Sequence, residues 1–266
     1  MNVHIYKYTC LTNLHMGSGD VNYNIIDDEV ERDPITNLPI LHASGIKGAL
    51  REHFTQKALP QEEIDRIFGT LSRTKESIGT GAYKFMDGRF LSRPMRIGGS
   101  ASMSHISVVS LGALNDYLRT LTDFGCNHYS IDAIDELTDA DFGENQFLTN
   151  CPYPGIQVEG EKTGMLPQNI IDQLSQLKDV LGRFVAVAKD LDKYPLPVVA
   201  RNHLENGRSR NLWYEEIVPH QSVFYQLIVT TTETMDLPLE QEPIQFGGNA
   251  TLGCGYIRIQ RIGGTK

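Results

Sequence analysis

One run of the sequence, Leu14 to Arg51, constrains the chain most, because it joins a glycine turn, an acid cluster, a tight turn and a basic helix start. Five acids fall within seven positions of this run, at Asp27, Asp28, Glu29, Glu31 and Asp33. They repel one another unless Arg32, a metal ion or solvent cations lie nearby. A solvated acidic loop is the commoner explanation of such a cluster. Asn37 in the following turn can take a left-handed backbone.

The end of this run predicts a helix with a basic face. Ser44 can cap the helix, Gly48 leaves its first turn open, and Lys47 and Arg51 fall on one face because they are four residues apart. Free backbone amides, a positive helix end and two cations together form an anion site, for which a polyphosphate backbone is the obvious ligand. A solvated helix face with glycines that only allow close packing explains these residues equally well.

Composition sets the broad class of the protein. The 266 residues are 40% hydrophobic and predict a folded body. The net charge of −9 argues against a protein that grips nucleic acid over its whole surface, although a local basic groove is compatible with it. Four scattered cysteines imply neither a disulfide framework nor a zinc site. No secretory leader or membrane-spanning run is visible, and we expect a cytoplasmic protein without a membrane partner.

Hydrophobic periodicity predicts an α+β fold. The expected elements include an opening strand at 3–12 and helices from Ser44, at 60–68, at 111–124 and at 167–181. Strands and helices do not alternate regularly, which favours an antiparallel, ferredoxin-like body. The acidic stretch at about 132–161 predicts an irregular insertion. Extended segments with a basic tip at about 195–212 predict a projecting hairpin, for which a plain surface loop is the default alternative.

Several blocks, taken together and in order, resemble the RAMP superfamily of CRISPR proteins. They are LHMGSG followed by IID, then GIKGALR, and finally GGNATLGCGY. The block NLWYEEIVP followed by FY, at 211–225, narrows the resemblance to the repeated backbone subunits of type III-B (Cmr) effector complexes. The resemblance spans most of the chain. It implies one RAMP domain over residues 1–266, with a modified ferredoxin-like (RRM-like) core, an antiparallel sheet, insertions and a projecting β-hairpin thumb.

The same resemblance implies an activity and partners. Copies of such subunits line up along a guide RNA with other Cmr complex subunits, and their thumbs press between bases of the guide–target duplex. They act as metal-dependent RNA-guided endoribonucleases that cleave the complementary target RNA at regular intervals when a divalent ion, Mg²⁺ or Mn²⁺, is present. The guide RNA, the target RNA, neighbouring copies of this chain and the other subunits are therefore the expected partners.

By position, the family's catalytic and metal-binding aspartate falls on Asp27, with Asp28 as a rival. His15 matches a family histidine near the site, and Glu215 matches the first acid of the WYEE block, so the resemblance makes both further candidate catalytic residues. Departures from the family pattern are Asn37 in place of a turn glycine, changes at His42 and Gly45, and a short arm. The expected RNA-binding residues are Ser44, Lys47, Gly48, Arg51, Arg201, Arg208, Arg210, Gly247, Gly248, Asn249, Gly253 and Gly255.

RNA carries its own nucleophile, the 2′-hydroxyl, so that an unstacked base step could free the backbone for in-line attack. Asp27 would hold a hydrated metal ion or accept the hydroxyl proton, and His15 would act as the acid or, as the favoured interpretation, as a hydrogen-bonded structural residue. Two alternatives remain at this point. One is a non-catalytic guide-RNA-binding subunit of the same filament, and the other is a metal-independent RAMP nuclease that processes the guide precursor.

Overall fold

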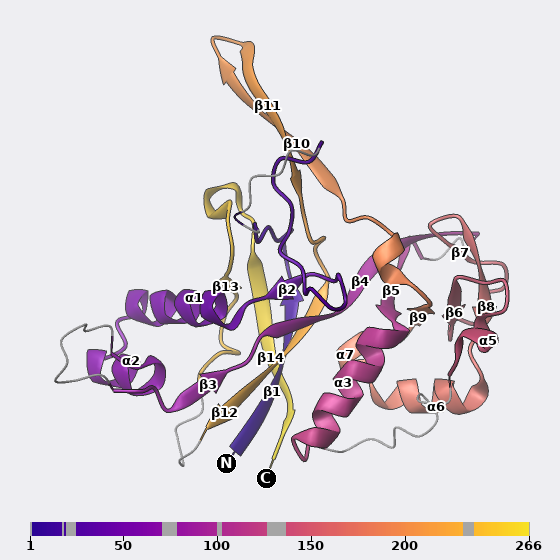
Figure 1. Cartoon of the computed structure of the whole chain (residues 1–266), viewed down its shortest axis with the longest axis horizontal. Coiled ribbons are helices and arrows are strands. Elements are labelled where there is room, and N and C mark those ends of the chain that lie inside the picture. Colours follow the sequence, from indigo (N-terminus) through magenta and orange to yellow (C-terminus); the bar gives the residue numbers. More distant parts are fainter. Residues whose placement is uncertain are drawn as a thin grey trace.

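The computed structural model describes residues 2–17, 19, 25–70, 79–99, 103–126, 137–230 and 237–265. In these residues a twelve-stranded mixed sheet forms the body, and a separate two-stranded hairpin projects from it (Figure 1). The strands of the body are β1 (Asn2–Cys10), β2 (Ile40–Leu41), β3 (Tyr83–Phe85), β4 (Gly88–Gly98), β5 (His105–Ser110), β6 (Phe147–Thr149), β7 (Gln157–Val158), β8 (Glu161–Met165), β9 (Val185–Ala188), β12 (Val223–Thr230), β13 (Ile244–Gln245) and β14 (Tyr256–Gly264).

Helices lie around this sheet, and the hairpin stands apart from them. The hairpin strands are β10 (Val198–Glu205) and β11 (Arg208–Glu216). The α-helices are α1 (Ala43–Gln56), α2 (Gln61–Phe68), α3 (Leu111–Asp123), α5 (Asp139–Phe142), α6 (Gln168–Gln176) and α7 (Lys178–Leu181), with 3₁₀ turns η1 (Leu191–Lys193) and η2 (Ala250–Leu252). None of the helices in the described ranges is both long and apolar enough to cross a membrane.

The sheet has an antiparallel half and a closed half. β14, β1, β12 and β4 are antiparallel neighbours, with α1 in the connection from β1 towards β4. Beyond β4 the order continues through β5, β9, β6 and β8 to β7, and β7 also pairs with β4. Six strands therefore close into a barrel-like ring. Buried aromatic side chains, among them Tyr8, Phe224 and Tyr225, fill the core between the sheet and its helices.

The α+β class is confirmed, but the expectation of a purely antiparallel sheet is wrong. β5 pairs with β9 in parallel, and so does β6 with β8. β6 lies in the segment expected to be an irregular insertion, at about 132–161, whereas β5 precedes that segment and β9 follows it. The described part of that segment, 137–161, contains α5, β6 and β7 and begins β8, while 132–136 lie outside the described residues. Strands of two or three residues are too short to leave a period-two pattern in the sequence.

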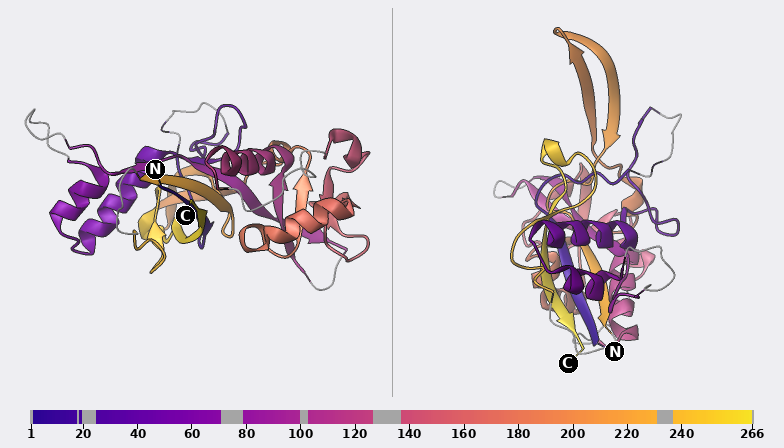
Figure 2. Two further views of the ribbon diagram at one scale, coloured as in Figure 1. Left: turned by 90° about the horizontal axis from the view of Figure 1, so that it is seen from below. Right: turned by 90° about the vertical axis from the view of Figure 1, so that its left-hand side faces the viewer.

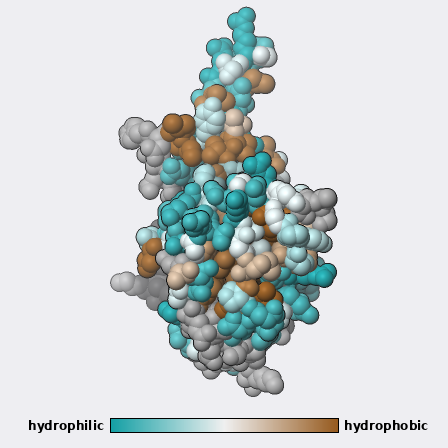
Figure 3. All heavy atoms as spheres, turned by 90° about the vertical axis from the view of Figure 1, so that its right-hand side faces the viewer, coloured by the Kyte–Doolittle hydropathy of each residue, from teal (hydrophilic) through white to brown (hydrophobic). Residues whose placement is uncertain are grey.

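The projecting hairpin turns at Asn206 and Gly207, which both have positive φ (49° and 76°). Asn-Gly is the sequence that favours such a two-residue turn. Pairing runs from Glu205↔Arg208 back to Val198↔Glu216, so the hairpin continues beyond 212. Figure 2 shows that it stands clear of the body, and Figure 3 shows that its tip is hydrophilic while apolar surface gathers where it leaves the body.

Local signals placed most helices correctly. α2 ends at Gly69 (φ 83°) and α3 starts at Leu111, as expected. The expected helix at 167–181 is divided at Leu177 into α6 and α7. The expected cap at Ser44 is wrong, because His42 is the N-cap of α1 and no side chain of the helix caps it. Asp87, from the loop before β4, accepts the Ala43 N–H through Oδ1 at 2.7 Å instead.

Candidate functional site

Four segments that are distant in the sequence meet where the hairpin leaves the body, a place we call the hairpin root. They are residues 13–15, the acidic segment 27–33, the outgoing hairpin leg 214–216 and the glycine loop 247–255. An antiparallel bridge joins Leu14 to Val218, and a parallel bridge joins Asp28 to Glu215. The root therefore gathers His15, Asp27, Glu215 and the glycine loop, which the sequence placed in separate blocks.

Asp27 is exposed and fixed to the outgoing leg. Its N–H donates to the Tyr214 carbonyl (3.0 Å), and the Tyr214 N–H donates to its Oδ2 (2.8 Å). The second carboxylate oxygen, Oδ1, points to no hydrogen-bond donor among the described residues. Asp28, the rival, is held by its backbone, because its carbonyl accepts the Glu216 N–H (2.9 Å) while its side chain is exposed. Asp27 thus combines a fixed position with an available oxygen.

His15 is 8% exposed and lies behind the acidic segment. Its Nδ1 is 2.8 Å from the Glu216 carbonyl oxygen, which can only accept, so we assign the ring proton to Nδ1. Nε2 lies next to Gly17, where an added Cβ would come within 3.3 Å of it. The hydrogen-bonded structural role favoured from the sequence agrees with this geometry, and the acid role stays a prediction.

Glu215 joins the hairpin to the glycine loop. Its buried carboxylate accepts hydrogen bonds from Arg201 Nε (3.0 Å), Trp213 Nε1 (2.8 Å) and Asn249 Nδ2 (2.8 Å). Burial by itself would raise the pKa of Glu215, but the hydrogen bonds from Trp213 and Arg201 and the Arg201 charge outweigh it and lower that pKa. A carboxylate with a lowered pKa and three donors is a weak base, so the geometry gives Glu215 a positioning role.

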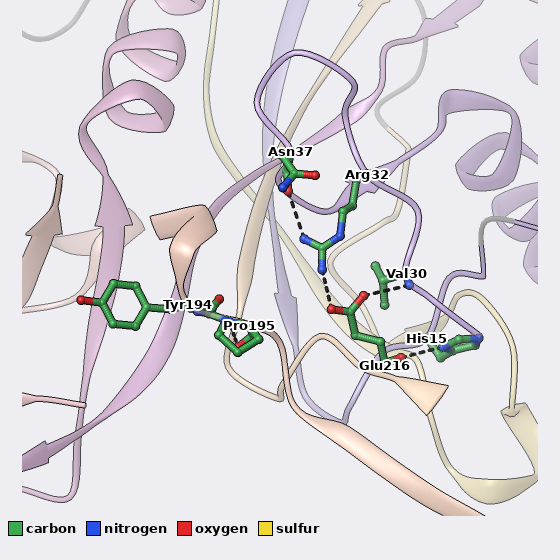
Figure 4. Close-up of polar contacts among 8 residues, drawn as sticks. His15, Val30, Arg32, Asn37, Tyr194, Pro195 and Glu216 are labelled. Carbon is green, nitrogen blue, oxygen red and sulfur yellow. Dashed lines mark hydrogen bonds and ion pairs between the residues drawn. The ribbon is translucent and has the colours of Figure 1, made fainter. Parts of the chain in front are cut away.

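Glu216 makes a second set of contacts, on the other side of the leg (Figure 4). Its buried carboxylate accepts the Val30 N–H (3.1 Å) and is ion-paired with Arg32, whose Nη1 donates to the Asn37 carbonyl (3.0 Å). The sequence raised Arg32 as a partner for the acid cluster, whereas the structure pairs it with Glu216. The sequence analysis did not single out Glu216. Its role could have been inferred from strand geometry, because successive side chains of a strand point to opposite faces and Glu216 must therefore contact other residues than Glu215 does.

The incoming hairpin leg has an anchor that the sequence did not reveal. Arg93 of β4 is buried and donates to the carbonyls of Tyr194 (2.6 Å) and Pro195 (3.1 Å), just before β10. Burial lowers the pKa of Arg93 to about 10, which leaves the guanidinium charged at neutral pH. Both legs of the hairpin are therefore tied to the body by buried charged side chains.

The glycine loop packs directly on the His15 segment. The Gly248 N–H donates to the His15 carbonyl (2.9 Å), and the Gly255 N–H donates to the Asn13 carbonyl (2.8 Å). At Gly247 (φ 72°) a Cβ would lie 2.3 Å from the His15 oxygen, and at Gly255 (φ 81°) it would lie 1.9 Å from the Phe246 oxygen. Close approach thus requires glycine at these two positions. Asn249 and Gly253 also have left-handed backbones, at the two ends of η2.

The expected basic face of α1 is only half available. Ser44 and Lys47 line an open depression together with Lys84, and Gly48 is exposed. Arg51 is turned towards α2, where it donates to the Gly69 carbonyl and lies over the Phe68 ring at 5.5 Å. The face that Arg51 shares with Lys47 is therefore partly covered by α2, and the RNA-binding role of Arg51 stays a prediction.

The hairpin arginines also differ from one another. Arg201 is committed to Glu215 at the root, and Arg210 forms an exposed ion pair with Glu205. Arg208, beside the turn, is exposed and has no ion pair among the described residues. Of the three, Arg208 is the cation most available to an external anion.

The root offers a metal ion the exposed carboxylate of Asp27, next to the exposed side chain of Asp28. The described residues hold no cluster of three or more His, Cys, Asp or Glu side chains that could hold a metal ion. Mg²⁺ keeps several waters and commonly uses one or two protein carboxylates together with substrate phosphates. A single available oxygen on an exposed Asp27 fits that mode of binding.

Comparisons with known proteins agree on one family. The model of the RAMP superfamily matches residues 7–258. A CRISPR system Cmr endoribonuclease, Cmr4 from Pyrococcus furiosus, is 25% identical over 288 aligned residues, covering 97% of this chain and 95% of that protein. Oligomeric Cmr4 from the same organism has a similar structure, with a TM-score of 0.72, 20% identity and 99% of both chains covered.

A chain of the type III-B Cmr-beta complex bound to cognate target RNA has the same similarity of fold. Its TM-score is 0.72 at 19% identity, and the match covers 97% of this chain and 96% of that chain. The whole described body, together with its hairpin, therefore corresponds to a known architecture.

Proposed function

The chain belongs to the RAMP superfamily, and from that premise we propose that it is a backbone subunit of a type III-B CRISPR effector complex that binds guide RNA and cleaves complementary target RNA. The observation that carries this proposal is the hairpin root, where Asp27 lies fixed beside a projecting hairpin and next to the glycine loop. The similarity to Cmr4 supports the assignment to this kind of complex.

The proposed division of labour follows from the surfaces. Ser44 and Lys47 at the start of α1, together with Lys84 in the same depression, offer amides and positive charge to the guide backbone. Exposed apolar side chains on the hairpin, Val198, Leu204, Leu212 and Tyr214, are suited to contact unstacked bases. Neighbouring copies and other Cmr subunits would cover further surface. We also propose that β14, β1, β12 and β4 with α1 correspond to the family's ferredoxin-like core.

The chemistry would take place at the root. A target nucleotide pushed aside by the hairpin has a backbone free to bring its 2′-oxygen in line with the scissile phosphate. Asp27 Oδ1 would accept the hydroxyl proton or hold a divalent ion, and that ion would neutralise charge on the phosphate. Oδ2 stays bonded to the Tyr214 N–H, which keeps the carboxylate from rotating away.

The test is cleavage of a complementary RNA by the assembled complex with Mg²⁺ or Mn²⁺ and with chelator. Asp27→Asn keeps an oxygen for the Tyr214 N–H, so that assembly on the guide persists while the cleavage rate falls roughly 100-fold to 10,000-fold. Asp28→Asn is the matched control and keeps activity. Undiminished cutting by Asp27→Asn would remove the catalytic role from this residue, and loss in Asp28→Asn alone would assign the role to Asp28.

The same assay decides the alternatives. A wild-type complex that assembles on guide RNA and cuts no target under any metal condition is a purely structural subunit. Cleavage of repeat RNA by the chain in chelator would identify a guide-precursor nuclease instead.

A further inference from the structure

Glu216 uses every one of its polar groups to hold the residues around Asp27. Its N–H donates to the Asp28 carbonyl (2.9 Å), and its own carbonyl accepts from His15 Nδ1 (2.8 Å). Its carboxylate accepts the Val30 N–H (3.1 Å) and pairs with Arg32 (Figure 4). One buried residue is thus bonded to both sides of the proposed catalytic centre.

We propose that Glu216 is a positioning residue, which together with Arg32 forms an ion-paired strap that holds the acidic segment on the hairpin root and thereby sets Asp27 relative to His15. The inference rests on the proposed function and deepens it, because it names what keeps that centre assembled.

Backbone hydrogen bonds tie the acidic segment to Tyr214 through Asp27 and Asp28 and to Met16 through Glu31, but apolar packing adds little to them. Val30 is its one buried apolar side chain, while Ile25 before it and Ile35 after it are 87% and 91% exposed. Its five acids repel one another and favour detachment. Arg32 is the only cation between residues 25 and 36. It reaches inward to Glu216, whose side chain is 6% exposed, and so ties the segment to the body.

The strap also extends to the next turn. Arg32 Nη1 donates to the Asn37 carbonyl (3.0 Å), and Asn37 has a left-handed backbone (φ 55°). Asp33 Oδ1 accepts the N–H groups of Ile35 and Thr36, at 2.9 Å each, which makes the turn rigid. The guanidinium therefore spans from a rigid turn to a buried carboxylate, whose other oxygen accepts the Val30 N–H. Loss of either partner loosens the segment at Val30 and Arg32, while the backbone bonds of Asp27 and Asp28 to Tyr214 remain, so that Asp27 shifts without detaching.

The experiment compares Glu216→Gln, Arg32→Gln and the double variant in the assembled complex. Glu63→Gln is the matched control, because it breaks the Glu63–Arg66 ion pair of α2, away from the root. Three quantities are measured for each: the single-turnover rate of target cleavage, the affinity for guide RNA, and the hydrogen-exchange rate of the Val30 amide.

Each single variant should cut about 10-fold to 100-fold more slowly, because displacement of a catalytic group by about 1 Å has an effect of this size. Guide affinity should stay unchanged, and the Val30 amide should exchange faster, even in Arg32→Gln, whose lost side chain contacted the Glu216 carboxylate and not the Val30 amide. The double variant should be no slower than the slower single variant, because both remove the same strap. The control should match the wild type in all three measurements.

Three results would overturn the inference. The first is a double variant in which the losses of cleavage rate of the two single variants multiply, and the second is a loss of guide affinity in proportion to the loss of cleavage rate. The third is an unchanged cleavage rate in a variant whose Val30 amide exchanges faster. Failure of the proposed function is separate, because it would appear as a wild-type complex that cuts no target. In that case the hydrogen-exchange rate of the Val30 amide still tests the strap. Faster exchange in Arg32→Gln than in the wild type supports the strap, and an unchanged rate refutes it.

Discussion

Replacing Glu215 with alanine should measurably destabilise the chain, because Glu215 is the residue that joins the hairpin to the glycine loop. The substitution leaves three donors without their acceptor: the Arg201 guanidinium, the Trp213 indole and the Asn249 amide. No neighbouring acid can take over as their acceptor, because Glu216, the next residue, faces the opposite side of the leg.

The expected size follows from the burial of the two charged groups. Breaking a buried ion pair by removing one partner costs about 3–5 kcal/mol. The Glu215 side chain is 7% exposed, but Arg201 is 24% exposed and recovers part of its hydration when it is left alone. We therefore expect the lower end of that range, about 3 kcal/mol. For a chain of this size that loss lowers the melting temperature by roughly 6–12 °C.

Thermal unfolding of the purified chain measures this loss, with Arg201→Ala and the double variant completing a cycle. The double variant should be less destabilised than the sum of the two single variants, because each single variant leaves a charge unpaired. Glu63→Ala, which removes a half-exposed pair in α2, should change stability by at most about 1 kcal/mol. A Glu215→Ala protein that melts at the wild-type temperature would refute the reasoning.

Three further predictions follow from the site. Arg51→Ala should reduce stability by about 1–2 kcal/mol without weakening guide binding by the folded protein. Lys47→Ala should instead keep the wild-type melting temperature and reduce the slope of log affinity for the guide against log salt concentration by about 1. Gly255→Ala should lower both stability and guide affinity, because its Cβ would lie 1.9 Å from the Phe246 carbonyl oxygen. Because folding lowers the pKa of Glu215, its carboxylate stabilises the folded chain fully at pH values above its ordinary pKa of 4.5, and this stabilisation is lost as the pH falls through the folded-state pKa. The free energies of unfolding of the wild type and of Glu215→Gln should therefore converge under acidic conditions.

Much of the fold could be predicted because its signals are local. Gly69 ends α2 and the Asn206–Gly207 pair turns the hairpin, since each supplies a positive φ that few residues tolerate. The length of α3 follows from its apolar spacing. The barrel-like closure could not be predicted in this way, because the β4–β7 pairing involves only two residue pairs, Ile97↔Val158 and Gly98↔Gln157, that are far apart in the sequence.

The sequence indicated which residues lie at the candidate site better than it indicated what each of them contacts. The ordered sequence blocks brought His15, Asp27, Glu215 and the glycine loop together, and the structure places them at one root. The contacts of Arg51 with α2 could not be predicted, because helical spacing states which residues share a face but not what packs on that face. Ser44 was misjudged as a cap because an acid from a distant loop, Asp87, already meets the first amide of α1.

The two neighbouring glutamates of β11 contact different segments of the root. Successive side chains of a strand point to opposite faces, so Glu215 reaches the glycine loop while Glu216 reaches the acidic segment. A hairpin that moved at its root would therefore pull on the glycine loop and on Asp27 together. Under the proposed function, displacement of the hairpin by a duplex would be mechanically linked to the position of the Asp27 carboxylate, and this linkage would favour cleavage at the hairpin over other positions along the RNA.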